Sequence, residues 1–101
     1  FTAARQEELV EEVLDTARAG GNGTYGPEET EKALREMRVD TLLLSRDFLW
    51  DRSDYADHCV GTAFAQGASV VEVGGPAGER LQEEGGGIAA RLRYRLPDDE
   101  G

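Results

Sequence analysis

The sequence is poor in the residues on which metal centres, disulfides and membrane spans depend. It has one cysteine, one histidine, one lysine and three prolines among its 101 residues. Cys59 has no partner for an internal disulfide, and no cysteine or histidine cluster has zinc-ligand spacing, so we expect neither a metal nor another cofactor. No apolar run approaches the ~20 residues of a membrane-spanning helix, and no signal-peptide pattern is present. We therefore expect a cytoplasmic protein without membrane contact.

Residue patterns typical of catalysis are also missing. His58 and Cys59 are adjacent, so a helix would direct their side chains about 100° apart, with no third group to orient them. The glycine-rich stretches "GGNG" and "GGPAG" lack the lysine and the register of a nucleotide-binding loop. We expect no enzymatic activity from this chain.

Acidic residues outnumber basic ones by 21 to 11, which gives a formal net charge of −10. This charge repels the phosphates of nucleic acids at long range and argues against DNA binding. The Debye length of about 8 Å at physiological salt still allows a local arginine cluster to act on its surroundings. The length fits one domain over residues 1–101. A start at Phe1, already inside a helical pattern, indicates a domain of a longer polypeptide, and residues 97–101 resemble a disordered tail.

Apolar periodicity predicts strands alternating with helices. The expected helices cover 3–19, 27–37, 53–66 and 76–84, and the expected strands cover 40–45, 68–73 and 88–96. Such an order indicates an α/β fold in which helices cover both faces of a sheet. The stretch 46–52 is interpreted as a loop. Trp50 within it either covers the core or serves as an exposed anchor for a partner.

The last predicted strand has an arginine on every second position. Ile88, Ala90 and Leu92 face one way, and Arg91, Arg93 and Arg95 face the other. An unpaired buried guanidinium is very costly, so these arginines must meet solvent, carboxylates or a partner. One interpretation pairs them with the chain's own glutamates, such as those of the first helix. The other is docking to an acidic partner or an RNA backbone.

Two segments match a known pattern. Residues 86–95 read "GGIAARLRYR", which agrees at seven of ten positions with Gly-Gly-Ile-Gly-Gly-Ile-Leu-Arg-Tyr-Arg, while Arg91 replaces the second isoleucine. Upstream, "TYGPEETEKAL" is similar to Phe-Gly-Val-Glu-Asp-Thr-Leu-Lys-Ala-Leu. Both segments resemble the C-terminal domain of archaeal and eukaryotic class-one peptide chain release factors, a domain that Pelota shares. The resemblance implies a three-layer α/β/α sandwich with a small mixed sheet, similar to the ribosomal proteins L7Ae and L30e.

The resemblance also implies a non-catalytic role in translation termination or ribosome rescue. In that family the C-terminal domain docks a translational GTPase and helps seat the factor on the ribosome, where RNA contact is part of the assembly. The family's Gly-Gly-Gln motif for peptidyl-tRNA hydrolysis does not occur in these residues. The expected partner-binding residues are Arg91, Leu92, Arg93, Tyr94 and Arg95 of the last strand, together with Trp50.

An alternative function is RNA binding of the kink-turn type. Proteins of this class with the same fold carry Gly-x-Asn-Glu-x-x-Lys at the start of the RNA-contacting helix, and Gly26, Glu29 and Lys32 resemble that pattern. Glu28 stands where the pattern has asparagine. A carboxylate cannot donate to an RNA acceptor and repels phosphate, so the docking function is the preferred interpretation.

Overall fold

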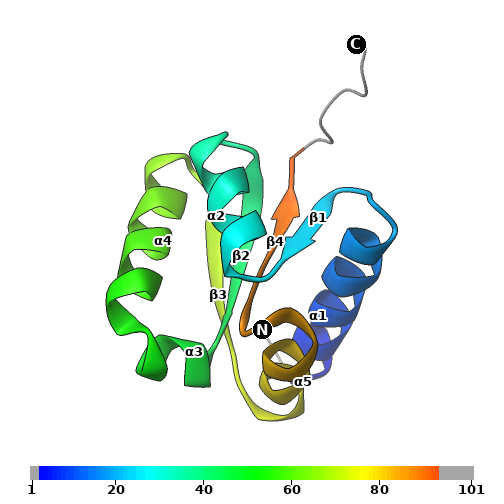
Figure 1. Ribbon diagram of the computed structural model, residues 1–101. Helices are drawn as coiled ribbons and strands as arrows, with labels where there is room; N and C mark the ends of the chain where they lie inside the picture. The colour runs from blue at the N-terminus through cyan, green and yellow to red at the C-terminus, as the bar shows by residue number, and fades with distance from the viewer. Residues whose placement is uncertain (1–2, 94–101) are drawn as a thin grey trace.

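A computed structural model of the chain describes residues 3–93. Its centre is a four-stranded mixed sheet in the order β1-β4-β2-β3, with helices on both faces (Figure 1). The strands are β1 (Gly23–Tyr25), β2 (Val39–Ser45), β3 (Ser69–Val73) and β4 (Ile88–Leu92), and the helices are α1 (Ala3–Arg18), α2 (Pro27–Arg35), α3 (Arg46–Asp51), α4 (Ser53–Ala65) and α5 (Gly75–Gly85). The predicted three-layer α/β/α sandwich is confirmed.

Strand β2 joins the two halves of the sheet. It runs parallel to β3, with Leu42 opposite Val70, and antiparallel to β4, with Leu42 opposite Ala90. Strand β1 pairs antiparallel with the outer side of β4. Every residue of β2 except Asp40 is buried, because helices cover both of its faces. Its apolar run is therefore the pattern expected of a central strand.

The core consists of one apolar cluster on each face of the sheet. The first cluster lies under α2 and α4, and the second lies under α1 and α5. Strand β4 contributes to both, because Ile88, Ala90 and Leu92 lie in the first cluster while Ala89 lies in the second. The face of β4 that we expected to be lined by arginines is thus apolar at its start and covered by helices.

Two elements were not predicted. Residues 23–25 form strand β1 between the first two predicted helices, where a Cβ at Gly23 would lie 2.9 Å from the carbonyl oxygen of Val13. The expected loop 46–52 is mostly helix α3, which begins because the Ser45 hydroxyl accepts the N–H of Phe48 at 3.1 Å. The Phe48 side chain is buried, with its ring edge-on to Tyr55.

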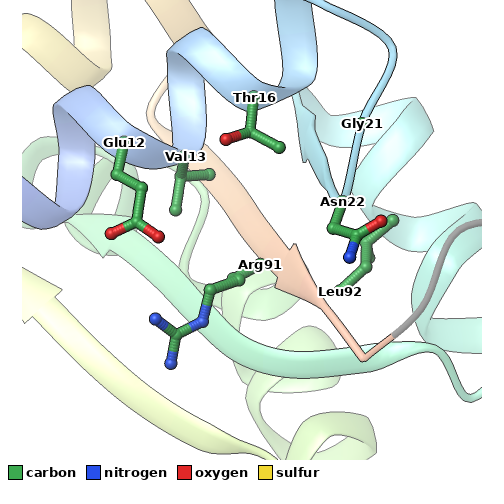
Figure 2. A pocket seen from close by; sticks show the side chains of 7 residues that line it. All are labelled: Glu12, Val13, Thr16, Gly21, Asn22, Arg91 and Leu92. Atoms are coloured by element: carbon green, nitrogen blue, oxygen red, sulfur yellow. The ribbon is translucent and has the colours of Figure 1, made fainter.

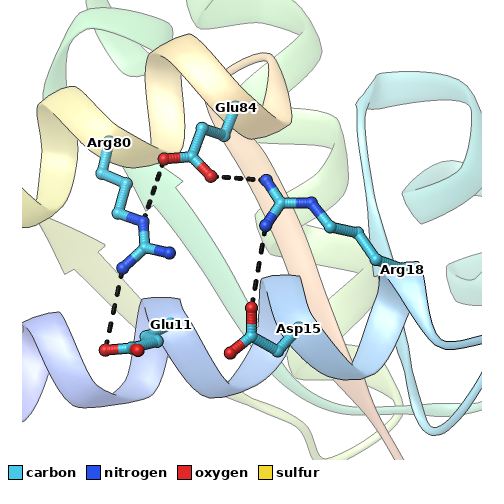
Figure 3. A network of polar contacts seen from close by, with 5 residues as sticks. All are labelled: Glu11, Asp15, Arg18, Arg80 and Glu84. Carbon is cyan, nitrogen blue, oxygen red and sulfur yellow. Dashed lines mark hydrogen bonds and ion pairs between the residues drawn. The ribbon is translucent and has the colours of Figure 1, made fainter.

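A network of ion pairs joins α1 to α5 (Figure 3). Arg80 of α5 lies 3.7 Å from Glu11 and 3.0 Å from Glu84. Arg18 of α1 binds the other oxygen of Glu84 and lies 3.7 Å from Asp15. One interpretation of the sequence paired the arginines of the last strand with glutamates of the first helix. In the structure Glu11 of α1 instead pairs with Arg80 of α5.

Two features bear on the expected class of protein. Among residues 3–93 no helix is long and apolar enough to cross a membrane, and no three His, Cys, Asp or Glu side chains are gathered to hold a metal ion. The tail expected at 97–101 lies outside the described residues.

Candidate docking surface

Arg91 lies near the C-terminal end of β4 and is held by the neighbouring strand. Its Nε and Nη2 atoms lie 3.2 and 3.1 Å from Asp40 Oδ2, and Nη2 donates to Thr41 Oγ1 at 3.4 Å. The two charged side chains are 41% and 49% exposed, so solvent screens the ion pair and limits its contribution to about 0–1 kcal/mol. Arg91 therefore has an internal partner on β2, although its guanidinium remains open to solvent on one side.

The position of Asp40 results from an irregularity in strand pairing. Val39 is opposite Leu92 and Thr41 is opposite Arg91, so Asp40 is an extra residue with no partner on β4. Such a bulge redirects a side chain relative to regular alternation. Asp40 and Thr41 were not identified from the sequence, because the register between two strands distant in the chain is not visible in either strand alone.

Arg93 follows β4 and supports the ends of two other elements. Its Nε donates to the carbonyl oxygen of Val39 at 3.1 Å, and its Nη2 donates to the carbonyl oxygen of Gln66. Gln66 caps the C-terminus of α4, where a cation interacts favourably with the helix dipole. The residue is exposed, and its Nη1 has no hydrogen-bond partner within residues 3–93. Arg93 thus combines a structural contact with a free donor.

A hollow of about 460 Å³ opens beside Arg91, between α1 and the sheet. Figure 2 shows Glu12 of α1 and Arg91 of β4 on its two sides, with Thr16 and Asn22 further along. Glu12 has no ion-pair partner in the described part of the chain. The hollow therefore offers a carboxylate, a guanidinium and small polar groups to one ligand.

The other expected partner-binding residues differ from Arg91 and Arg93 in exposure or position, or lie outside the described residues. Leu92 is only 5% exposed and packs in the core under α2 and α4, although it also lines the hollow beside Arg91 (Figure 2). Tyr94 and Arg95 lie outside the described residues. Trp50 is 83% exposed, but α3 lies at the opposite end of the sheet from the C-terminus of β4 (Figure 1). Trp50 and the arginines therefore lie at opposite ends of the sheet, and a partner that contacts both must span its length.

The residues of the alternative RNA site extend from the N-cap of α2 to its last turn. Gly26 is the N-cap with φ of +89°, and Glu29 and Lys32 are exposed. A hollow of about 350 Å³ at the N-terminal end of α2 is lined by Glu28 and Glu29 as well as Arg52. Two carboxylates at the helix N-terminus oppose the binding of a phosphate.

Comparison with known proteins establishes the family. The model of the family described as eRF1 domain 3 matches residues 3–96. The chain belongs to the eRF1 domain 3 family. It is 33% identical over 95 residues to a protein pelota homolog of Methanocaldococcus jannaschii, covering 92% of this chain and 26% of that protein. The chain thus spans about a quarter of the length of the curated relatives it matches.

Solved structures of eRF1 domain 3 relatives share the fold. Pelota from Archaeoglobus fulgidus superimposes with a TM-score of 0.83 at 26% identity, covering 93% of this chain and 31% of that one. A chain in a model of ribosome-bound archaeal Pelota and ABCE1 gives a TM-score of 0.78 at 33% identity, covering 93% of this chain and 27% of that chain. The predicted membership of the release-factor and Pelota family is confirmed.

Proposed function

We propose that this eRF1 domain 3 chain is a non-catalytic docking domain that binds a translational GTPase or the ribosome during termination or ribosome rescue in the cytoplasm. Support comes from the similarity to a chain of ribosome-bound archaeal Pelota. The whole protein would supply any chemistry from other domains, because the described residues bring together no nucleophile, base and orienting group.

One observation carries the location of the contact. Arg91 and Arg93 lie two residues apart at the C-terminal end of β4, Arg91 beside α1 and Arg93 at the C-terminus of α4, and each keeps part of its guanidinium open to solvent. A guanidinium of this kind forms forked hydrogen bonds to carboxylates and phosphates. Asp40 and the carbonyl oxygens of Val39 and Gln66 hold the two side chains in place, which lowers the entropy lost on binding.

The proposal is tested with a pulldown on the immobilised 101-residue chain. Purified ribosomes and a translational GTPase from Methanocaldococcus jannaschii serve as separate probes. Arg93→Ala is expected to lower the affinity at least tenfold, since an interface arginine in a hot spot contributes about 2 kcal/mol or more. Arg35→Ala is the matched control, because Arg35 is an exposed arginine on α2 that forms no ion pair within residues 3–93, and it should stay within about twofold of wild type.

Folding and the RNA alternative are controlled in the same series. Circular dichroism must show that Arg93→Ala keeps the native fold, because Arg93 also braces the end of α4. Equal recovery of both variants would overturn the assigned surface. Binding of neither probe, together with a salt-sensitive gel shift on kink-turn RNA, would replace docking by RNA recognition through α2.

A further inference from the structure

The outer edge of β3 carries backbone groups that no other strand covers. β3 is the last strand of the sheet, and within residues 3–93 nothing pairs with its outer side as a strand. A strand edge presents unpaired N–H and C=O groups and is a template for a further strand. Peptide recognition by strand addition uses such edges.

One side chain of α1 already occupies part of this edge. Gln6 Nε2 donates to the carbonyl oxygen of Glu72 at 3.3 Å, and Gln6 Oε1 accepts the N–H of Gly74 at 3.4 Å. A residue of a parallel strand placed opposite Val73 would make these two bonds, to the residues before and after its partner. The Gln6 amide therefore takes the place of one residue of a fifth strand.

The contacts of Gln6 also show which backbone groups point outward. Glu72 and Gly74 face away from β2, and residues two apart in a strand share a direction. Val70 therefore faces outward as well. Among residues 3–93 no strand pairs with its N–H and C=O or with the N–H of Glu72, while Gln6 limits any added strand to the stretch beside Ser69–Glu72.

A second hollow adjoins this stretch and would receive side chains of an added strand. Its volume is about 270 Å³, and it lies between α1 and the sheet. It is lined on the sheet side by Thr41, Ser69, Val71 and Arg91, and on the helix side by Arg5, Glu8, Leu9 and Glu12. Residues directly opposite each other in paired strands point to the same face. The residues opposite Ser69 and Val71 would therefore point toward this hollow.

The charges of the second hollow favour a cation. Arg5 lies 3.1 Å from Glu8, and Arg91 lies 3.1 Å from Asp40, so both arginines have carboxylate partners. Glu12 is the carboxylate of the lining without an ion pair in the described part of the chain. The net charge of −10 acts in the same direction, because it attracts basic segments and repels a second copy of this chain.

We propose that β3 accepts an extended, basic segment of a protein partner as a fifth strand. The segment would pair with the open groups of Val70 and Glu72 and would place a lysine or arginine side chain against Glu12. This binding mode is separate from the docking through Arg93. It is tested with peptides and not with ribosomes, so the two proposals succeed or fail independently.

The first test titrates the ¹⁵N-labelled chain with short peptides. Acetyl-Thr-Val-Lys-Val-Thr-amide is compared with the same peptide carrying glutamate in place of lysine. The lysine peptide is expected to shift the amide signals of Val70 and Glu72 and to bind at least fivefold more tightly than the glutamate peptide. Shifts confined to another part of the chain, or equal affinities, would overturn the proposal.

Backbone methylation of the peptide tests strand pairing without altering the protein. One peptide is N-methylated at both valines and another at the lysine, which removes different backbone donors. One of the two should lose binding, according to whether the strand adds antiparallel or parallel. Retention of full affinity by both peptides would contradict strand addition.

Variants of the chain then locate the contact. Val70→Pro removes an outward N–H at an edge, where proline is tolerated, and should abolish binding. Glu12→Gln should weaken the lysine peptide at least fivefold, whereas Glu83→Gln, at an exposed glutamate of α5, should change it less than twofold. Signal broadening at Val70 and Glu72 that grows with protein concentration in the absence of peptide would assign the edge to a second copy of this chain and refute the protein-partner proposal.

Discussion

The glycine immediately before β4 has a role that can be tested quantitatively. Gly87 has φ of +88°, a conformation that side-chain-bearing residues rarely adopt. A Cβ at this position would lie 2.6 Å from Gln82 Oε1 and 2.9 Å from Phe48 Cβ. Phe48 is 2% exposed, so it has little room to move. Gly87→Ala therefore introduces backbone strain and overpacking together.

The expected cost follows from these two effects. The left-handed backbone contributes about 1–2 kcal/mol, and displacement of Phe48 contributes about 1–3 kcal/mol, giving about 2–5 kcal/mol in total. Gly86→Ala is the control, since Gly86 also has a positive φ of +69° but its Cβ would lie an ordinary 3.4 Å from Pro27 Cδ. Only the strain applies there, so we expect about 1–2 kcal/mol.

Urea unfolding followed by circular dichroism measures both variants against wild type. The free energy of unfolding of Gly87→Ala should be at least about 1 kcal/mol lower than that of Gly86→Ala. This difference corresponds to a melting temperature about 4–8 °C lower. If Gly87→Ala does not fold, the Phe48→Leu background should restore part of its stability by making space. Equal stabilities of the two alanine variants would refute the close approach of Phe48.

Three further predictions concern stability. Gly61→Ala should raise the free energy of unfolding by about 0.5–1 kcal/mol, because Gly61 lies inside α4 with no atom within 4 Å of an added Cβ. Met37→Gly should raise it by about 0.5–1 kcal/mol in the same urea assay, because Met37 is 61% exposed and adopts φ of +58° after α2. Burial raises the pKa of Tyr55 to about 12, so the stability that its neutral form contributes is complete below pH 10.0 and is lost as the pH rises toward 12. Unfolding of wild type and Tyr55→Phe across this range checks the sign, since the loss should be smaller in the variant.

Much of the fold was visible in the sequence because its signals are local. The apolar run of β2 indicates that both faces of this strand are buried. The helical spacing of apolar residues in α1 and α2 indicates that one face of each helix is buried. Strand β1 was missed because three residues form no period, and only the approach of Val13 to Gly23 shows why a strand fits there. Helix α3 was missed because its six residues carry no repeating stripe, although Ser45 is a recognisable N-cap.

The candidate site was only partly predictable, because its geometry depends on contacts between distant segments. Alternation placed Arg91 and Arg93 on one side of a strand, but β4 ends at Leu92, and Arg93 turns to the C-terminus of α4 while Arg91 lies beside α1. It did not show that Asp40 occupies a bulge opposite Arg91, since this depends on the β2–β4 register. The separation of Trp50 from the arginines likewise follows from the sheet topology, which places α3 at the other end.

The most direct test of docking through the end of β4 is chemical footprinting of arginines. The chain is treated with phenylglyoxal in the presence and absence of saturating ribosomes, and each modified arginine is quantified by mass spectrometry. We predict at least tenfold protection of Arg93, partial protection of Arg91, and unchanged modification of the control Arg35 on α2. Modification of Arg93 at its free rate while the chain is fully bound, or protection of Arg35 alone, would contradict the assignment.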